Sequence, residues 1–477
     1  MYKNFITVIG LEIHLQLNTK TKMFSPENYF FGGSPNTQTH PVSLALPGTL
    51  PAINKEVIKS AVKLGIALNC KINKENFFDR KNYFYSDLPK GYQITQFNTP
   101  ICTNGEIEIS DNKKIKLTRI HIEEDTGKSI HDQDPFNSLI DLNRAGVPLL
   151  EIVTEPDIRS ENEAYSMLYE MRKIVRYLEI SNGNMEEGSL RCDANISICK
   201  KGDKKFGTKV EIKNMNSINN VKQAILYEKE RQIDLITKNK KIKQETRLYD
   251  AVKNKTISMR SKEESNDYRY FPEPDLLPVV IKEKEIIEIK KNIPILPKEL
   301  KKIFINKHKL SEYDANILTE DKSIAFYYLE VIKNNSNFKI AANFIIGKIK
   351  SHLNEKKITI NDMKIKPDKI SNLIDLISKK TINYSTGSNI VFPIMLQNPN
   401  TNPNKIVSEK NLTQESDDKI INQYIKEVIN KYPKKVQEFK NGKKGLIGLF
   451  MGEIMNLSKG KIDPKKTNIL LNNKLHE

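Results

Sequence analysis

The pattern of apolar and polar residues changes near residue 290. Before that point, short β-branched runs are interrupted by Gly, Pro and Asn, and several of them alternate apolar with polar residues. A period of two is typical of strands that have one buried face. The predicted strands lie at 5–17, 114–125, 149–157 and 190–199.

Helices are expected between these strands. Asn54 precedes a run in which apolar residues recur at helical spacing, and Ser160 followed by Glu163 forms a capping box before a second such run. Strands and helices interspersed in this way predict an α+β fold for residues 1–292.

Helical spacing dominates from Pro294 onward. A loop rich in Asn, Pro and Thr at 396–405 is expected to separate a final unit. We therefore expect an all-helical domain over 293–408 and a small, basic helical tail domain over 409–477. The predicted helices of the first of these domains include 322–333, 338–353 and 367–379.

The chain is strongly basic, with 77 Lys and Arg against 59 Asp and Glu in 477 residues and a net charge of +18. The tail holds a large share of this surplus, because residues 419–477 contain 13 Lys and 5 acidic residues. A field of this sign attracts polyanions. Nucleic acid or nucleotides are the expected partners, and an acidic membrane surface is the second choice.

No segment is expected to enter a membrane. The longest apolar runs, such as 446–455, are shorter than the roughly 18 residues that a span requires. Glu12 interrupts the apolar N-terminal stretch, which is typical of a strand and not of a signal peptide. The four cysteines form no CxxC pair and fit a reduced compartment. We therefore expect a cytoplasmic protein without a membrane partner.

The N-terminal strand carries candidate chemistry on one face. In GLEIHLQL (10–17) the side chains of Glu12, His14 and Gln16 share a face, and Leu and Ile occupy the other. An acid, an imidazole and an amide in line suit a metal ion or a nucleotide. The alternative is a half-exposed strand whose polar face meets solvent.

A second acidic group lies in HIEED (121–125). His121 and Glu123 share one face of the predicted strand, and Glu124 lies on the other. Adjacent acids repel one another, and Mg²⁺ would relieve that repulsion because it prefers carboxylate oxygens. Glu151 in LLEIVTEP adds a further carboxylate. Together these residues predict a site for a hard metal ion.

Long stretches that combine these acids with Arg, Lys, Tyr and Asn follow one another along nearly the whole chain. In this order they resemble the GatB/GatE family, the B subunits of glutamyl/aspartyl-tRNA amidotransferases. The stretches are GLEIHLQL (10–17), FDRKNYFYSDLPKGYQI (78–94), TRIHIEEDTGK (118–128), SLIDLNRAGVPLLEIVTEPDIRS (138–160), GNMEEGSLRCDANIS (183–197), VEIKNMNS (210–217), DYRYFPEPDL (267–276) and KNGKKGLIGLFMGEIMNLSKGKIDPK (440–465).

The resemblance implies a mixed-sheet, cradle-shaped domain, then a helical domain and a tail domain that contacts tRNA. It implies that ATP phosphorylates the side-chain carboxylate of Glu-tRNA(Gln) or Asp-tRNA(Asn), with Mg²⁺, and that ammonia then forms the amide. Ammonia would come from an amidase partner, the A subunit, which a small C subunit braces in a heterotrimer. This chain has no Ser-Gly-rich amidase signature, so we expect no release of ammonia by the chain alone.

The resemblance also assigns residues. The expected Mg²⁺ ligands, which also serve as catalytic residues, are Glu12, His14, Glu124 and Glu151. The expected contacts with ATP and substrate are Lys81, Lys90 and Arg191 for phosphates and Tyr83 and Tyr85 for the terminal adenosine. In the tail, the helical spacing of the apolar residues leaves a set of lysines facing outward, and these are the expected tRNA contacts: Lys434, Lys435, Lys440, Lys443, Lys444, Lys459 and Lys461.

One departure from the family concerns metal binding. Many relatives carry four cysteines around 22–48, in the manner of a zinc knuckle, where this chain has Ser25, Glu27, His40 and Ser43. Serine is a poor zinc ligand, so we expect no structural zinc.

Two other functions remain as alternatives. A noncatalytic scaffold that presents tRNA fits the basic tail, although clustered acids would repel phosphates in it. ATP hydrolysis that depends on charged tRNA would discriminate against the scaffold. An aminoacyl-tRNA synthetase is the third interpretation, and amino-acid-dependent pyrophosphate exchange would identify it.

Overall fold

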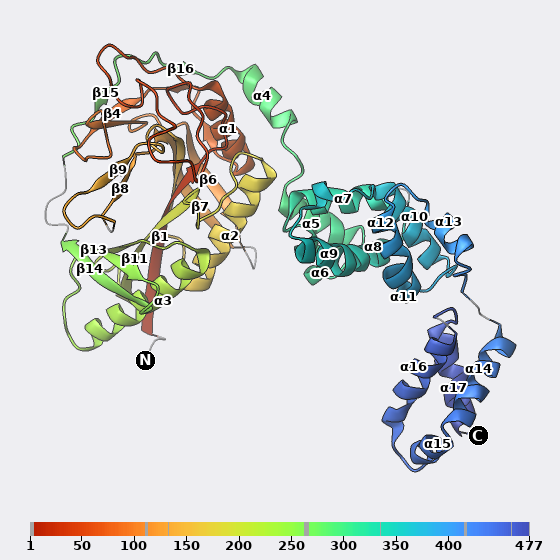
Figure 1. Cartoon of the computed structure of the whole chain (residues 1–477). Helices are drawn as coiled ribbons and strands as arrows, with labels where there is room; N and C mark the ends of the chain where they lie inside the picture. The colour runs from red at the N-terminus through yellow and green to blue at the C-terminus, as the bar shows by residue number, and fades with distance from the viewer. Residues whose placement is uncertain are drawn as a thin grey trace. The chain divides into compact units, whose positions relative to one another are not determined.

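The computed structural model describes residues 4–109, 113–131, 133–261, 267–333, 335–414, 417–458 and 460–476, without the side chains of residues 260 and 261. The chain forms two compact units, Met1–Leu296 and Pro297–Glu477 (Figure 1). The first unit contains the sheet and the second contains helices, so the expected α+β class is confirmed. The finer division of the second part at residue 408 stays a prediction.

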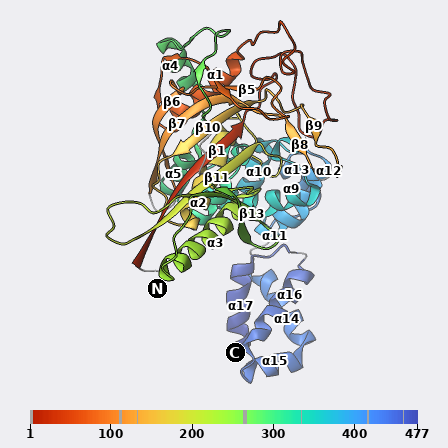
Figure 2. The ribbon, with the colours of Figure 1, turned by 90° about the vertical axis from the view of Figure 1, so that its left-hand side faces the viewer.

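A 12-stranded sheet organises the first unit. β1 (Phe5–Gln16) lies between β10 (Pro148–Thr154) and β11 (Leu190–Lys200) and pairs antiparallel with both, and β7 (Lys114–Glu124) pairs with the far side of β10 (Figure 2). The sheet is mixed, because β12 and β13 pair in parallel. Its other strands are β2 (Lys71–Ile72), β4 (Asp79–Asn82), β5 (Tyr92–Thr95), β6 (Cys102–Glu108), β12 (Val210–Lys213), β13 (Glu245–Asp250), β14 (Lys255–Ser261) and β15 (Phe271–Pro272).

Alternation along β1 decides which side of the sheet is apolar. Leu11, Ile13 and Leu15 are buried, and Glu12 and His14 point to the other face. Burial of the apolar face against helices is the main driving force for this arrangement. The helices that pack on the sheet are α1 (Lys55–Ala67), α2 (Glu161–Tyr177) and α3 (Ile218–Thr237).

The helix starts predicted from the sequence are confirmed. The side chain of Asn54 accepts a hydrogen bond from the amide of Glu56 at the start of α1, and that of Ser160 accepts one from Glu163 at the start of α2. Both side chains satisfy amides that the helix itself leaves without a partner.

A β-bulge at Thr118 reverses the alternation along β7. Leu117 pairs with Thr154 and Arg119 with Val153, so β7 advances by two residues where β10 advances by one. Ile115 and Leu117 are buried before the bulge. After it, the even-numbered Ile120 and Ile122 are buried instead. The odd-numbered side chains from Arg119 onward therefore face the polar side of the sheet.

The second unit is helical, as predicted, and α7 (Lys322–Ile332) and α10 (Pro367–Ser378) match their predicted ranges closely. The loop predicted at 396–405 is shorter than expected, because α13 begins at Pro403 with Asn402 as its N-cap. The other helices are α5 (Pro297–Asn306), α6 (Glu312–Leu318), α8 (Phe338–Phe344), α9 (Lys350–Lys356), α11 (Tyr384–Thr386), α12 (Phe392–Gln397), α13 (Pro403–Glu409), α14 (Asp418–Lys431), α15 (Pro433–Lys440), α16 (Ile447–Leu457) and α17 (Pro464–His476).

The last four helices enclose an apolar cluster of their own. Ile421, Ile425 and Val428 of α14 are buried in it, together with Phe450 of α16 and Leu471 of α17. Among the described residues, no helix is both long and apolar enough to cross a membrane.

Candidate active site

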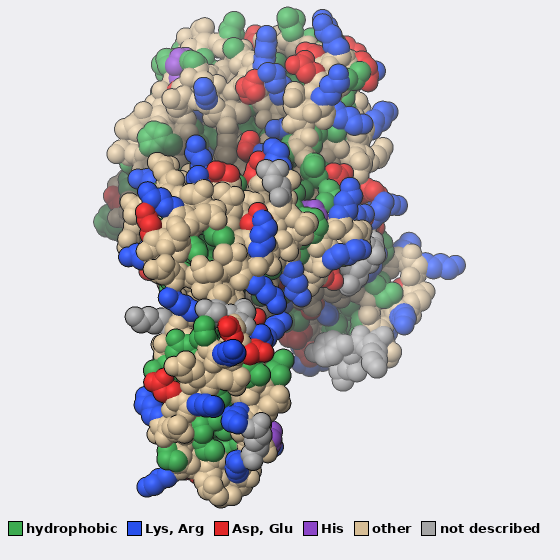
Figure 3. Space-filling view, turned by 90° about the vertical axis from the view of Figure 1, so that its right-hand side faces the viewer, with side chains coloured by type: hydrophobic (Ala, Val, Ile, Leu, Met, Phe, Trp, Pro, Cys, Tyr) green, Lys and Arg blue, Asp and Glu red, His purple; other side chains and the backbone are tan. Residues whose placement is uncertain are grey.

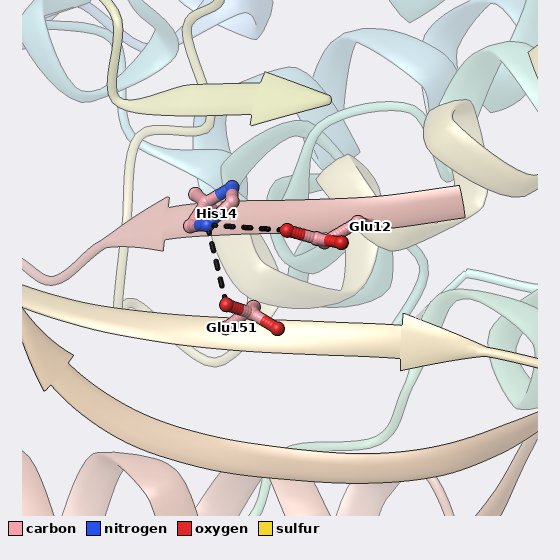
Figure 4. Close-up of side chains that lie close together, drawn as sticks. All are labelled: Glu12, His14 and Glu151. Carbon is pink, nitrogen blue, oxygen red and sulfur yellow. Dashed lines mark ion pairs between the residues drawn. The ribbon is translucent and has the colours of Figure 1, made fainter. Parts of the chain in front are cut away.

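The pairing register of four strands places chemistry in one row across the polar face of the sheet. His14 on β1 lies opposite Arg191 on β11 and Glu151 on β10, and Glu151 lies opposite His121 on β7. Glu12 lies two residues before His14 on β1 and points to the same face, as Figure 4 shows. The strands that carry residues 12 and 14, 121 and 151 are far apart in the sequence, and the sheet makes them neighbours.

Glu151 is the centre of two groups of possible metal ligands. His14 Nε2 lies 3.4 Å from Glu151 Oε2 and 3.9 Å from Glu12 Oε1. His121 Nε2 lies 3.5 Å from Glu151 Oε2 and 3.9 Å from Glu123 Oε2. Each set of three ligand atoms, Glu12–His14–Glu151 and His121–Glu123–Glu151, lies within 4.8 Å. We call these five residues the carboxylate–histidine cluster.

The pKa values of the two histidines in this cluster are shifted in opposite directions. Burial lowers the pKa of His14, but Glu151 and Glu123 outweigh it and raise that pKa to about 9. Burial dominates at His121 and lowers its pKa to about 4. The cluster therefore contains one imidazole that its neighbouring acids keep protonated and one that burial keeps neutral.

The carboxylates show that the cluster is short of positive charge. Burial, with Glu151 nearby, raises the pKa of Glu12, and burial raises the pKa of Glu123 to about 7. Burial also opposes ionisation of Glu151, but His14 and His121 outweigh it and lower its pKa to about 2. Such opposed shifts within one group of residues are typical of functional sites.

Glu124 is not part of the carboxylate–histidine cluster. It lies on the other face of β7, where its Oε1 contacts Lys90 Nζ and accepts a hydrogen bond of 3.0 Å from the amide of Ile94. The structure thus brings together Glu12, His14 and Glu151 of the four predicted ligands and places Glu123 where Glu124 was expected. The alternation of HIEED had already put Glu123 on the same face as His121, so the sequence contained this signal.

Lys81, Tyr83 and Tyr85 lie together at the end of β4 and just after it. Lys81 Nζ lies 5.8 Å from the centre of the Tyr83 ring and 4.9 Å from that of Tyr268, and the Tyr83 and Tyr85 rings are 5.9 Å apart. Lys81 is also close enough to contribute to the lowered pKa of Glu151. Sequence reasoning did not assign a role to Tyr268, which pairing of β15 with β4 brings here.

The other two predicted phosphate contacts are engaged by acids. Lys90 is paired with Glu124. Arg191 Nη2 donates a hydrogen bond of 2.9 Å to Asp125 Oδ2, which also accepts one from Gln16. Burial opposes ionisation of Asp125, but Arg191 and Arg144 outweigh it and lower its pKa. Arg191 is therefore held beside His14 by a buried carboxylate.

The residues at the knuckle positions contact one another and a buried lysine, and the absence of a structural zinc stays a prediction. Lys22 is fully buried, and its Nζ lies 3.2 Å from Glu27 Oε1 and donates to the carbonyl of Gln38 at 2.8 Å. The Ser43 hydroxyl donates to the carbonyl of His40 at 3.0 Å. An ammonium already neutralises the carboxylate of this loop, and hydroxyls are poor zinc ligands.

The predicted tRNA contacts lie on the last helices and the turns between them. Lys434, Lys440, Lys443 and Lys444 are exposed, and Lys435 and Lys461 are partly buried. Lys459 lies outside the described residues. Lys435 and Lys443 each lie 3.2 Å from an oxygen of Glu438. Lys and Arg side chains are scattered widely over the face of the molecule in Figure 3.

Comparison with known families defines the class of this protein. Residues 7–287 match the family described as the GatB/GatE catalytic domain, and residues 327–475 match the family described as the GatB domain. The chain therefore belongs to the GatB/GatE family, and the prediction that it is an amidotransferase component is confirmed. The match to the catalytic domain contains the whole carboxylate–histidine cluster.

Particular relatives are similar over almost their full length. The B subunit of the aspartyl/glutamyl-tRNA(Asn/Gln) amidotransferase of Thermodesulfovibrio yellowstonii is 50% identical over 97% of this chain and 98% of its own. The protein of the same name from Vesicomyosocius okutanii is 47% identical over 98% of this chain and 99% of its own. That from Clostridium tetani is 45% identical over 99% of both chains.

Proposed function

We propose that this chain activates the side-chain carboxylate of Glu-tRNA(Gln), Asp-tRNA(Asn) or both with ATP, and that ammonia converts the activated group to the amide. The observation that carries the proposal is the carboxylate–histidine cluster around Glu151, within the part of the chain that matches the family's catalytic domain. The names of the relatives supply the substrate class.

We propose that Glu12, His14, Glu123 and Glu151 hold Mg²⁺, and that His14 loses its proton when the cation binds. Their donor set fits a hard cation, since oxygens from three strands converge and burial raises the pKa of Glu12 and Glu123, a strain that a bound cation would relieve. Bound Mg²⁺ would offset the repulsion between a carboxylate nucleophile and the phosphates of ATP. The paired strands β1, β7 and β10 keep these side chains in place.

The chain must position both the phosphates of ATP and the terminal adenosine of the tRNA. Lys81 places an ammonium beside the cluster, where it can contact phosphates. The adjacent rings of Tyr83 and Tyr85 offer faces on which the terminal adenosine of the tRNA can stack. Tyr85 is 61% exposed, so its ring is available to a ligand.

Ammonia is proposed to come from an amidase partner, the A subunit, with a small C subunit in the same heterotrimer. The relatives are each named as a B subunit, which fits such a division of work. The chain purified alone should neither hydrolyse glutamine nor react covalently with a glutamine analogue. Detection of either reaction would overturn this division.

The tail is proposed to contact the body of the tRNA. Its lysines lie on helices with a separate apolar cluster, and phosphate contacts are salt-sensitive because binding releases counterions. Deletion of residues 409–477 from the assembled complex should weaken tRNA binding and flatten its salt dependence, while ATP binding survives. An unchanged affinity and salt slope would exclude the tail as a contact.

One assay tests the catalytic proposal against its alternatives. The assembled complex should hydrolyse ATP only with a misacylated tRNA and form amide when glutamine is added. Glu-tRNA(Gln) and Asp-tRNA(Asn), tested separately, identify the substrate. A scaffold would show no ATP hydrolysis, and a synthetase would catalyse pyrophosphate exchange with a free amino acid.

A further inference from the structure

The bulge at Thr118 brings Arg119 to the polar face of the sheet. Before the bulge the odd-numbered residues of β7 face the apolar core, and after it they face the carboxylate–histidine cluster. Arg119 is the first side chain after the switch, and it lies on the same face as His121 and Glu123. Bulges often re-aim a side chain next to an active site.

The guanidinium of Arg119 lies at the margin of the cluster, and its terminal N–H groups are not used in hydrogen bonds among the described residues. Its Nε donates to His121 Nδ1 at 3.4 Å, and its Nη2 lies 3.8 Å from Glu151 Oε1. The side chain is 41% exposed, so a ligand can reach its terminal nitrogens from solvent.

Apart from Lys81, three other cations near the cluster are paired with acids. Arg191 is hydrogen-bonded to Asp125 at 2.9 Å, and Lys213 contacts Asp193 and lies 3.3 Å from Glu211. Lys90 is paired with Glu124 on the other face of β7. Arg119 therefore differs from these three because its charge is close to the cluster without being used by a tight ion pair.

We propose that Arg119 binds the polyphosphate of ATP through its two terminal nitrogens, an inference that rests on the proposed function. A guanidinium presents two parallel donors that match phosphate oxygens, and such charge-assisted pairs are strong. A site with three carboxylates repels ATP unless cations offset that charge, and Arg119 supplies one more cation at its margin. Arg119 and Lys81 would then both contact the phosphates.

A purely structural role makes a different prediction. If Arg119 served only to neutralise Glu151 and orient His121, its replacement would lower the affinity for Mg²⁺ and leave ADP binding measured without Mg²⁺ unchanged. Binding of ADP and of adenosine separates the two roles, because adenosine carries the base and ribose of ATP without its phosphates.

The experiment compares R119Q, R119K and the control K116Q in the assembled complex. Lys116 lies on the same strand before the bulge and is exposed, so K116Q removes one positive charge from β7 away from the cluster. We expect R119Q to weaken ADP binding, measured without Mg²⁺, by roughly 30-fold, as for charge-assisted hydrogen bonds, and to leave adenosine binding within about twofold. R119K should recover part of the lost ADP affinity, because lysine restores the positive charge but not the two parallel donors of the guanidinium.

The same variants should show the loss in turnover. R119Q should lower kcat/KM for ATP in the reaction with charged tRNA, and K116Q should match the wild type. The inference fails if R119Q binds ADP within about threefold of the wild type, or if ADP and adenosine binding fall together. If R119Q does not fold, R119K is compared with the wild type in the same way, by its loss of ADP affinity relative to its loss of adenosine affinity. Wild-type complex that hydrolyses no ATP would instead refute the proposed function itself.

Discussion

Glu123 and Glu124 are neighbours in the sequence, yet they lie on opposite faces of β7 and their carboxylates have different partners. On one face, Glu123 and Glu151 meet histidines at 3.4 to 3.9 Å. On the other, Glu124 contacts Lys90, and Glu27 lies 3.2 Å from Lys22 nearby. Breaking a buried ion pair destabilises a fold, whereas a buried acid with a raised pKa, such as Glu123, indicates where a ligand can supply the missing charge.

The largest effect is expected from Glu151→Gln, because Glu151 belongs to both groups of ligand atoms. Loss of the negative charge of Glu151 should weaken Mg²⁺ binding and lower the rate of ATP hydrolysis with charged tRNA by about 1,000-fold, or about 4 kcal/mol. Isothermal titration with Mg²⁺ and single-turnover kinetics measure the two effects. Glu106→Gln is the matched control and should behave as the wild type, because Glu106 of β6 lies in an outlying ion pair with Lys114. A Glu151→Gln complex that reacts at the wild-type rate would contradict the site.

Glu123→Gln and Glu124→Gln separate the two faces of β7 directly. Glu123→Gln should weaken Mg²⁺ binding, and Glu124→Gln should leave that binding within about twofold. Glu124→Gln should instead lower the free energy of unfolding by about 3 kcal/mol, because it leaves Lys90 without its charged partner. Urea denaturation measures the stability, and Lys90→Met added to Glu124→Gln should restore part of it. If Glu124→Gln abolishes Mg²⁺ binding, then the ligand is Glu124, as the family resemblance implied.

A smaller effect tests the ion pair of Glu27 with Lys22. Burial opposes ionisation of Glu27, but Ser25, Ser43 and Lys22 outweigh it and lower its pKa below the ordinary 4.5. A lowered pKa in the folded state stabilises the protein above pH 4.5, and that gain is lost as the pH falls through the folded value. Glu27→Gln should therefore cost about 1 kcal/mol at about pH 7 and almost nothing near pH 3.

Urea denaturation of both proteins between about pH 3 and 7 checks this dependence. Glu56→Gln is the control, because Glu56 is 64% exposed in its pair with Lys59, and such pairs contribute about 0.5 kcal/mol or less. A stability difference for Glu27→Gln that stays constant over the whole range would show that the carboxylate charge does not stabilise this loop.

Local patterns in the sequence determined the elements of this protein. Alternation predicted β1, β7, β10 and β11, helical spacing and the caps at Asn54 and Ser160 predicted the helix starts, and ordered motifs indicated the family. These features depend on residues close in sequence, which is why they can be recognised without a fold. Alternation also separated Glu123 from Glu124.

The tertiary structure decided how those elements meet. Which glutamate of HIEED faces His14 depends on the register of β7 with β10 and on the bulge at Thr118, which arise from pairing between distant segments. The same pairing leaves Arg119 at the cluster with only a long ion pair to Glu151 and engages Arg191 and Lys90 closely with acids. A residue's type and spacing therefore predicted its chemistry, but its partners across the sheet decided whether its charge is available to a ligand.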